Sequence, residues 1–341
     1  MPAIELRLMT ESFPYSILSK TQLIEQMNLL ATSHTPFLFV VDYRAEHGYV
    51  IRMDELDSDY VRFEFEDTKP ELNAQTKEHK ILLWDIQPLS LKEFQPKFEY
   101  VENQIHLGNS FLVNLTQPTE IRTNLSLSEI YSQSKAKYKL WIKDSMLVLS
   151  PETFVRIEGR TISSFPMKGT IDAAMANAEQ VILNDPKEMA EHATIVDLIR
   201  NDLSLAAEKV EVKRYRYVEK IKTNKQDLLQ LSSEITGLLP DDYQQRLGDI
   251  LFALLPAGSI CGAPKAKTLE IINNAEGYER GFYSGICGYF DGENLDSGVM
   301  IRFIEQNGDR MVFKSGGGIT AGSEMIKEYE ELIQKVYVPV F

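Results

Sequence analysis

The sequence predicts an α+β fold of mixed, layered architecture, because many short strand-like runs alternate with a few well-delimited helices. The chain has 341 residues, of which 43% are hydrophobic and 25% charged, so it can bury a large core as one domain or two closely joined ones. The expected strands are apolar or alternating runs, whereas the expected helices carry apolar residues three and four apart. No internal repeat or low-complexity tract interrupts this pattern, which is typical of a globular protein.

Residues 1–90 are expected to form a short N-terminal subdomain packed on the rest of the chain. Apolar spacing predicts a helix near residues 21–31, and short apolar runs predict several strands. These strands are expected at residues 37–41, 48–52, 60–65 and 81–84. The charged stretch 66–80 is expected to be a surface loop. No residue here has a catalytic pattern, so we expect the chemistry in the larger unit, residues 91–341.

The larger unit begins with an amphipathic helix, because apolar residues from Phe94 to Ile105 recur at spacings of four, three and four before Gly108. A second helix is expected from about Ser126. Strands are expected at residues 111–116, 139–142, 146–149, 154–158 and 161–165. The last of these leads directly into Pro-Met-Lys-Gly-Thr at residues 166–170.

The remaining elements follow the same rules of periodicity and glycine or proline punctuation. Strands are expected at residues 210–218, up to 237, and at 282–290, 298–304 and 311–314. Helices are expected at residues 241–255, from Pro264, and at the end of the chain. The glycine-rich stretch 315–322 is expected to be a loop whose free N–H groups face a ligand.

A buried helix that begins at Pro186 carries acidic residues on its first turns. Asp185 is a suitable N-cap, and Glu188 lies three residues beyond it, as in a capping box. Glu188 and Glu191 lie on one face, with His192 beside them. Two interpretations of this segment remain open. In the first, Glu188 only caps the helix, Glu191 forms an ion pair and His192 is a core histidine. In the second, the carboxylates form a site for a hard cation.

A second pair of carboxylates, Glu328 and Glu331, lies on the last helix, and Lys335 follows one turn later. By itself this pattern is typical of a solvated helix face. The helix that begins at Pro264 offers N–H groups for an anion, although a simple tight turn would have the same sequence. If the two Glu pairs converge, they could hold Mg²⁺ beside an anionic small molecule.

Overall charge and termini narrow the class of protein. The net charge of −14 argues against non-specific binding to nucleic acid or to a membrane surface, since both need a positive field. The N-terminus lacks the apolar segment of a signal peptide, and no apolar run approaches membrane-spanning length. Cys261 and Cys287 are too few for a disulfide framework and are expected to be buried and inert. We therefore expect a cytoplasmic enzyme.

Several motifs together resemble the chorismate-utilising enzymes, which comprise the large subunits of anthranilate synthase and aminodeoxychorismate synthase, isochorismate synthases and salicylate synthases. The motifs occur in the family's order from about Leu91 to the end of the chain. They are the stretches 109–116, 150–152, 166–170, 188–202, 258–265, 283–285, 301–302, 316–319 and 328–331. The resemblance implies a layered α/β sandwich with the active site in a cleft between two sheets.

The resemblance also implies roles for individual residues. Four carboxylates correspond to the family's Mg²⁺ shell, namely Glu188, Glu191, Glu328 and Glu331. The groups expected to bind the substrate's carboxylates and side chain are Arg302, Tyr283, Lys335, Ser259 and the backbone of Gly317 and Gly318. Thr170 and His192 are expected to line the substrate ring.

Two positions, Lys168 and Leu112, indicate the branch of the family, and Glu152 matches the acid that its chemistry needs. Lys168 resembles the lysine of aminodeoxychorismate synthases, where anthranilate synthases carry alanine; there its amine is thought to attack C2 of chorismate as the C4 hydroxyl leaves. Glu152 matches the general acid that protonates the departing hydroxyl. Leu112 stands where isochorismate and salicylate synthases have a water-activating lysine, so water is not the expected nucleophile.

These features imply an aminodeoxychorismate synthase large subunit, which converts chorismate and ammonia to 4-amino-4-deoxychorismate for p-aminobenzoate and folate synthesis. Ammonia would come from a separate glutamine amidotransferase, because this chain lacks a Cys-His pattern for glutaminase chemistry. Met167, Ala257 and Cys261 depart from the family's usual residues but are small or apolar exchanges. The alternatives are an anthranilate synthase large subunit and a non-catalytic chorismate-binding subunit. The N-terminal region lacks a recognisable tryptophan-binding pattern, so inhibition by tryptophan is not expected.

Overall fold

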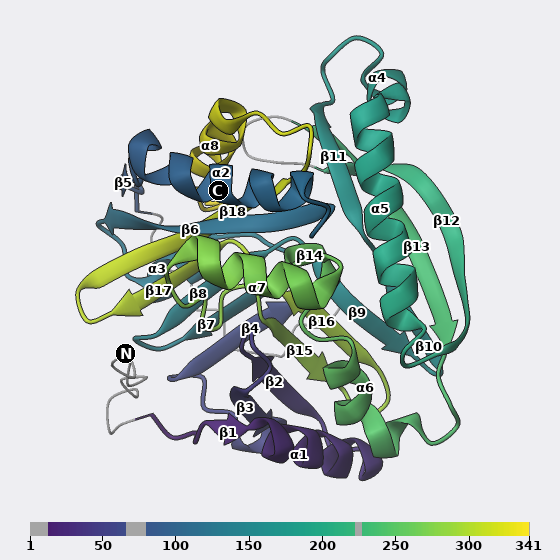
Figure 1. Ribbon diagram of the computed structural model, residues 1–341. Helices are drawn as coiled ribbons and strands as arrows, with labels where there is room; N and C mark the ends of the chain where they lie inside the picture. The colour runs from purple at the N-terminus through teal and green to yellow at the C-terminus, as the bar shows by residue number, and fades with distance from the viewer. Residues whose placement is uncertain (1–12, 66–79, 222–226, 341) are drawn as a thin grey trace.

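Two antiparallel β-sheets face each other and carry helices on their outer sides (Figure 1). The computed structural model describes residues 13–65, 80–221 and 227–340. The larger sheet has ten strands in the order β1-β3-β2-β15-β16-β9-β10-β13-β11, with β12 paired to β13. The smaller sheet has eight strands in the order β14-β6-β18-β17-β8-β7-β4, with β5 paired to β6. The predicted α+β layered fold is therefore confirmed.

The strands are short apart from the pairs β6/β18 and β12/β13. The larger sheet consists of β1 (Leu18–Ser19), β2 (Phe37–Val41), β3 (His47–Arg52), β9 (Thr153–Glu158), β10 (Thr161–Ser164), β11 (Met167–Asp172), β12 (Glu208–Ile221), β13 (Leu228–Leu238), β15 (Ile286–Phe290) and β16 (Leu295–Val299). The smaller sheet consists of β4 (Val61–Phe65), β5 (Trp84–Gln87), β6 (Leu112–Thr123), β7 (Tyr138–Ile142), β8 (Met146–Ser150), β14 (Gly262–Ala263), β17 (Phe303–Asn307) and β18 (Arg310–Ile319).

The helices begin where the sequence supplies caps. They are α1 (Lys20–Thr32), α2 (Leu91–His106), α3 (Leu127–Gln133), α4 (Ala178–Asn184), α5 (Pro186–Leu203), α6 (Leu247–Ala253), α7 (Lys265–Glu276) and α8 (Met325–Gln334). Ser90 and Glu93 form the capping box of α2. The Glu188 backbone N–H donates to Asp185 Oδ1 at 3.0 Å, which confirms the predicted start of α5. Within the described residues, no helix is long and apolar enough to cross a membrane.

Strand β2 shows why the core is layered. All five of its residues are buried, so its sequence is apolar throughout instead of alternating. Leu38 and Val40 pack in the cluster between the two sheets, with residues of β4, β7 and β8. Phe39 and Val41 point the other way and pack in the cluster under α1 and α6. Both faces of the larger sheet are thus covered.

The N-terminal region contributes to both sheets. Strand β2 pairs with β15, β4 pairs with β7 and β5 pairs with β6. Within the described residues, the first 90 positions therefore share both sheets with the rest of the chain. Most of the expected charged loop at residues 66–80 lies outside the described residues, which resume at Lys80.

Several predicted elements differ from the structure, among them the strand predicted at 81–84, which is β5 at Trp84–Gln87. The strand predicted at 298–304 is the end of β16 and the start of β17, separated where Arg302 adopts a positive φ of 51°. The helix predicted at 241–255 is a short 3-10 turn followed by α6. The loop predicted at 315–322 is wrong for Gly316–Gly318, because these residues belong to β18 and pair with β6. Helix α4 was not expected.

A fully buried ion pair joins several elements near the middle of the molecule. The Arg280 guanidinium contacts Glu276 at 2.6 Å, and the two side chains are 1% and 2% exposed. Arg280 also donates to the backbone oxygens of Ile260 at 3.0 Å and Asn114 at 2.7 Å. Glu276 accepts from the backbone N–H and the hydroxyl of Thr116, each at 2.8 Å. The end of α7 is thereby attached to β6 and to the turn that precedes β14.

We expect Glu276→Gln to lower the free energy of unfolding by about 3 to 5 kcal/mol, because it leaves a buried guanidinium without its counter-charge. Urea unfolding followed by circular dichroism would measure the change. The matched control is Glu279→Gln, whose carboxylate pairs with Arg44 at an exposed site and should matter little. Equal stability of the two variants would contradict this view of the ion pair.

Candidate active site

A polar cavity of about 470 Å³ is lined by both sheets and by helices α5 and α8. It lies where β11 and α5 face β18 and α8 (Figure 1). Every site residue predicted from the sequence lines it except His192. These residues are Glu152, Lys168, Thr170, Glu188, Glu191, Ser259, Tyr283, Arg302, Gly317, Gly318, Glu328, Glu331 and Lys335. Segments far apart in the sequence therefore do converge on one cavity.

Strand β11 presents consecutive residues to the cavity because its register is irregular. Pairing with β13 shifts between Met167 and Thr170, and Gly169 between them has a φ of +80°. A regular strand would turn alternate side chains away. Here Met167, Lys168, Gly169 and Thr170 all line the cavity. A side chain at position 169 would also collide with Glu188, since its Cβ would lie 2.8 Å from Oε2.

The Lys168 amine lies at the centre of this arrangement. Its Nζ is 3.4 Å from Glu191 Oε2, and the side chain is 26% exposed. A Cβ built on Gly318 would lie only 3.3 Å from Nζ, so the glycine leaves the amine room on the opposite wall. The same Cβ would lie 2.9 Å from Leu112 Cδ1. The amine is thus held between α5 and β18, facing the cavity.

Glu152, just after β8, lines the same cavity and is hydrogen-bonded to Ser259. The Ser259 hydroxyl donates to Glu152 Oε1, and the Glu152 backbone N–H donates to Ser150 Oγ at 3.1 Å. Burial raises the pKa of Glu152 above its usual value, while the Ser259 hydrogen bond and the charges of Lys168 and Lys335 act in the opposite direction. A carboxyl group in this environment is suited to give and take a proton.

The four predicted metal-binding carboxylates lie in two pairs on different walls. Glu188 and Glu191 are on α5, while Glu328 and Glu331 are on α8. A Cβ built on Gly317 would lie 3.3 Å from Glu328 Oε2, so the glycine keeps the space before that carboxylate open. Among the described residues, no three acidic, histidine or cysteine side chains are already grouped closely enough to hold an ion.

This donor set is nevertheless suited to Mg²⁺. The ion prefers oxygen ligands, usually takes one or two protein carboxylates, and fills its other positions with water and substrate oxygens. Carboxylates on facing walls of one cavity provide such ligands without forming a closed cage. Mg²⁺ at this site stays a prediction.

Cationic and hydroxyl groups complete the wall near β18. Lys335 Nζ lies 2.6 Å from Glu331 Oε1 and donates to the Gly316 carbonyl at 2.9 Å. The Arg302 guanidinium lies 4.2 Å from the ring centre of Tyr337, which orients it. Burial raises the pKa of Tyr283 to about 12, so its hydroxyl stays protonated at neutral pH. These groups are suited to an anionic ligand.

His192 lies behind the cavity wall, not in it. It is one residue beyond Glu191, which places it about 100° around the helix. The side chain is fully buried, its Nε2 lies 2.7 Å from Ser233 Oγ, and its ring meets Tyr215 edge-on. Burial lowers the pKa of His192 to about 4, so the ring is neutral at pH 7. The expected contact with a substrate ring is therefore absent from this geometry.

Sequence reasoning missed four polar residues of the cavity wall, Asn114, Gln230, Lys314 and Ser315. Asn114 lies two residues after Leu112 on β6, so the two side chains share a face of the strand. The predicted strand therefore indicated that Asn114 accompanies Leu112. Gln230 lies opposite Thr170 across β11 and β13, and only the register reveals that neighbour. Lys314 is buried and donates to the Arg280 carbonyl at 2.9 Å.

We expect Ser259→Ala to raise the pKa of Glu152 further, because the lost hydrogen bond favours the charged carboxylate. The protonated carboxyl should then persist to higher pH. Infrared difference spectra against Glu152→Gln, recorded across pH, would report its titration. Ser164→Ala, which removes a hydroxyl that donates instead to the Phe154 carbonyl, is the control. An unchanged or lowered pKa in Ser259→Ala would contradict the assignment.

Comparison with known proteins gives concordant results. The family of chorismate binding enzymes matches residues 15–340. An uncharacterized PabA-like protein of Pasteurella multocida is 48% identical over 318 residues, covering 93% of this chain and 98% of that protein. Aminodeoxychorismate synthase component 1 of Klebsiella aerogenes is 33% identical over 264 residues, covering 73% of this chain but only 57% of that protein.

Anthranilate synthase component 1 of Thermococcus kodakarensis is 31% identical over 258 residues, covering 72% of this chain and 59% of that protein. Among solved structures, anthranilate synthase component I from Streptococcus pneumoniae has the same fold, with a TM-score of 0.72 at 22% identity over 97% of this chain and 94% of that chain. Since the family match spans nearly the whole chain, this protein belongs to the chorismate binding enzyme family.

Proposed function

We propose that this protein is the large subunit of an aminodeoxychorismate synthase, which converts chorismate and ammonia to 4-amino-4-deoxychorismate. The observation that carries the proposal is the position of Lys168, whose amine lies 3.4 Å from Glu191 in the cavity that Glu152 also lines. A nucleophile and a proton-donating acid in one cavity are what an exchange of hydroxyl for amine requires.

The cavity suits a small dicarboxylate. At about 470 Å³ it can enclose a molecule of chorismate's size. Arg302 and Lys335 supply donors for carboxylates, and Gly317 and Gly318 line the same cavity without side chains. The carboxylates of α5 and α8 would hold Mg²⁺ at one end, and the ion would neutralise a substrate carboxylate there.

The chain's own residues then account for the chemistry. The Lys168 amine attacks C2 of chorismate, the ring double bond shifts, and the bond between C4 and its hydroxyl breaks. Glu152 gives its proton to the departing hydroxyl, which leaves as water. Ammonia then bonds to C4, the double bond returns, and the amine of Lys168 is released.

Two features favour this branch over its relatives. Leu112 lines the cavity near Gly318 and cannot activate a water molecule, which argues against an isochorismate synthase. An anthranilate synthase would not need an amine at position 168, and the similar identities to relatives of both names do not separate the two. A non-catalytic subunit would have no use for the pairing of Ser259 with Glu152.

Ammonia would come from a glutamine amidotransferase partner, and p-aminobenzoate would require a separate lyase. The expectation of a cytoplasmic location stays a prediction.

The test of the function is a product assay with chorismate, Mg²⁺ and ammonium salt, with and without an aminodeoxychorismate lyase. p-Aminobenzoate formed only with the lyase is the expected result. Anthranilate would favour the other synthase. If no product forms, the assay is repeated with an amidotransferase and glutamine, and continued inactivity would favour the non-catalytic subunit.

We expect Lys168→Ala to lower the rate of amination about a thousandfold or more, because the covalent step loses its nucleophile. Rapid-quench assays of product formation would measure the loss. The control is Lys327→Ala on α8, whose exposed amine pairs with Glu324 outside the cavity. If the cavity variant aminates chorismate at the rate of the control, the lysine does not act as a nucleophile.

We expect Glu328→Gln to weaken Mg²⁺ binding about tenfold, because a neutral amide replaces a buried carboxylate ligand. Isothermal titration with MgCl₂ in the presence of chorismate would measure this without turnover if Lys168→Ala is the background. Glu324→Gln, one turn earlier and exposed, should bind Mg²⁺ as before. Equal affinities would exclude Glu328 from the metal site.

A further inference from the structure

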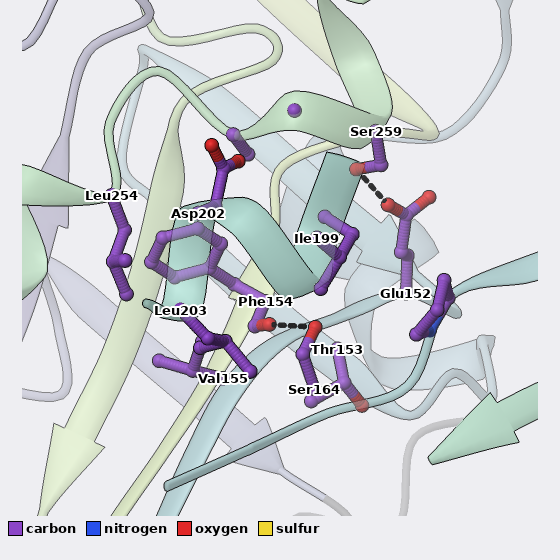
Figure 2. A pocket seen from close by; sticks show the side chains of 13 residues that line it. Glu152, Thr153, Phe154, Val155, Ser164, Ile199, Asp202, Leu203, Leu254 and Ser259 are labelled. Atoms are coloured by element: carbon purple, nitrogen blue, oxygen red, sulfur yellow. Dashed lines mark hydrogen bonds between the residues drawn. The ribbon is translucent and has the colours of Figure 1, made fainter. Parts of the chain in front are cut away.

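A second, much smaller cavity is lined by Glu152 as well (Figure 2). It holds about 20 Å³, enough for one water-sized molecule and far too little for a ring. Its walls come from β9, α5 and the segment before β14, with apolar side chains in the majority. They are Glu152, Thr153, Phe154, Val155, Ser164, Pro166, Ile199, Asp202, Leu203, Leu254, Ala257, Gly258 and Ser259.

The two cavities share a wall. Glu152 and Ser259 line both of them, so the hydrogen-bonded pair of side chains is the partition between them. Figure 2 shows this pair at one end of the small cavity and Leu254 and Asp202 at the other. A molecule in the small cavity therefore lies against the same Glu152 and Ser259 side chains that face the substrate cavity.

The chemistry of the walls favours a small neutral molecule over a cation. Asp202 is already paired with Lys265, whose Nζ lies 2.7 Å from Oδ2 and also donates to the Leu254 carbonyl at 3.0 Å. No uncompensated negative charge therefore draws in ammonium at that end. At the other end, the Glu152 carboxyl and the Ser259 hydroxyl offer hydrogen bonds to one small guest. The apolar side chains between them fit ammonia in its uncharged form.

We propose that the small cavity is a binding site for one molecule of ammonia, the nucleophile of the second half of the reaction. This inference rests on the proposed function. The site explains why a cavity too small for any other reactant is lined by Glu152. It also places ammonia next to Glu152, the group that protonates the departing hydroxyl.

The step balances with the groups present. After the hydroxyl has left as water, Glu152 is a carboxylate and Lys168 is bonded to C2. Ammonia donates its electron pair to C4, the ring double bond shifts, and the bond between C2 and Lys168 breaks with its pair returning to the amine. The new C4 ammonium then gives one proton to Glu152, which restores the acid.

Ile199→Phe tests the site by filling it, because Ile199 lines the small cavity and not the large one (Figure 2). The variant should raise the KM for ammonium salt about tenfold at fixed pH and leave the KM for chorismate unchanged. Leu254→Phe fills the cavity from its other end and serves if the first variant does not fold. Val196→Ile is the control, since Val196 is buried on the same helix and lines neither cavity.

High-resolution crystal structures of the protein in ammonium salt provide a readout without turnover. Density for one small molecule in the wild-type cavity, lost in Ile199→Phe, is expected. An empty wild-type cavity would overturn the site. Density in the wild-type cavity together with an unchanged KM for ammonium in Ile199→Phe would mean that the cavity holds only water. That outcome would overturn the ammonia site and leave the proposed function intact. A wild-type protein that makes no aminated product, even with an amidotransferase and glutamine, would remove both proposals.

Discussion

The buried contact between Arg280 and Glu276 fixes the relative positions of the parts that form the active site. One guanidinium holds the end of α7, the strand β6 through Asn114, and the turn at Ile260, next to Ser259. Lys314 of β18 donates a hydrogen bond to the Arg280 carbonyl, so β18 is attached to the same residue. A buried pair of this kind adds little net stability over an apolar alternative, but its many directed hydrogen bonds permit only one arrangement of these elements. The hydroxyl that faces Glu152 is therefore placed by a salt bridge that does not touch the cavity.

Charges inside the cavity are balanced although the whole protein is strongly acidic. Two lysines on its walls each contact one member of a Glu pair, Lys168 with Glu191 and Lys335 with Glu331, while Lys314 pairs with Glu305. A substrate with two carboxylates, bound together with one divalent cation, would add no net charge to this arrangement. Such a site does not depend on a positive surface field, which agrees with the net charge of −14. Selection of an anion can thus be entirely local.

Much of the fold could be predicted because the chain follows local rules closely. Serine and glutamate cap α2, Asp185 caps α5, and apolar runs such as that of β2 mark the strands. Predictions failed where tertiary contacts override these rules. Gly316–Gly318 belong to a strand because β6 passes too close for a side chain: a Cβ on Gly316 would lie 2.5 Å from Thr116 Cγ2. In the site, the motifs identified the groups but not their orientation, as His192 shows. Gln230 could not be found because only the register of β11 and β13 makes it a neighbour of Thr170.

The strand order has a consequence for how the protein is made. Strand β2 has no sequence neighbour on one side; its partner there is β15, which begins at Ile286. During synthesis, the early strands therefore remain without that partner until most of the chain has left the ribosome. Contacts so distant in sequence slow folding and leave apolar strand edges open in the meantime. The larger sheet is therefore complete only when β15 pairs with β2, so the early strands cannot form it by themselves.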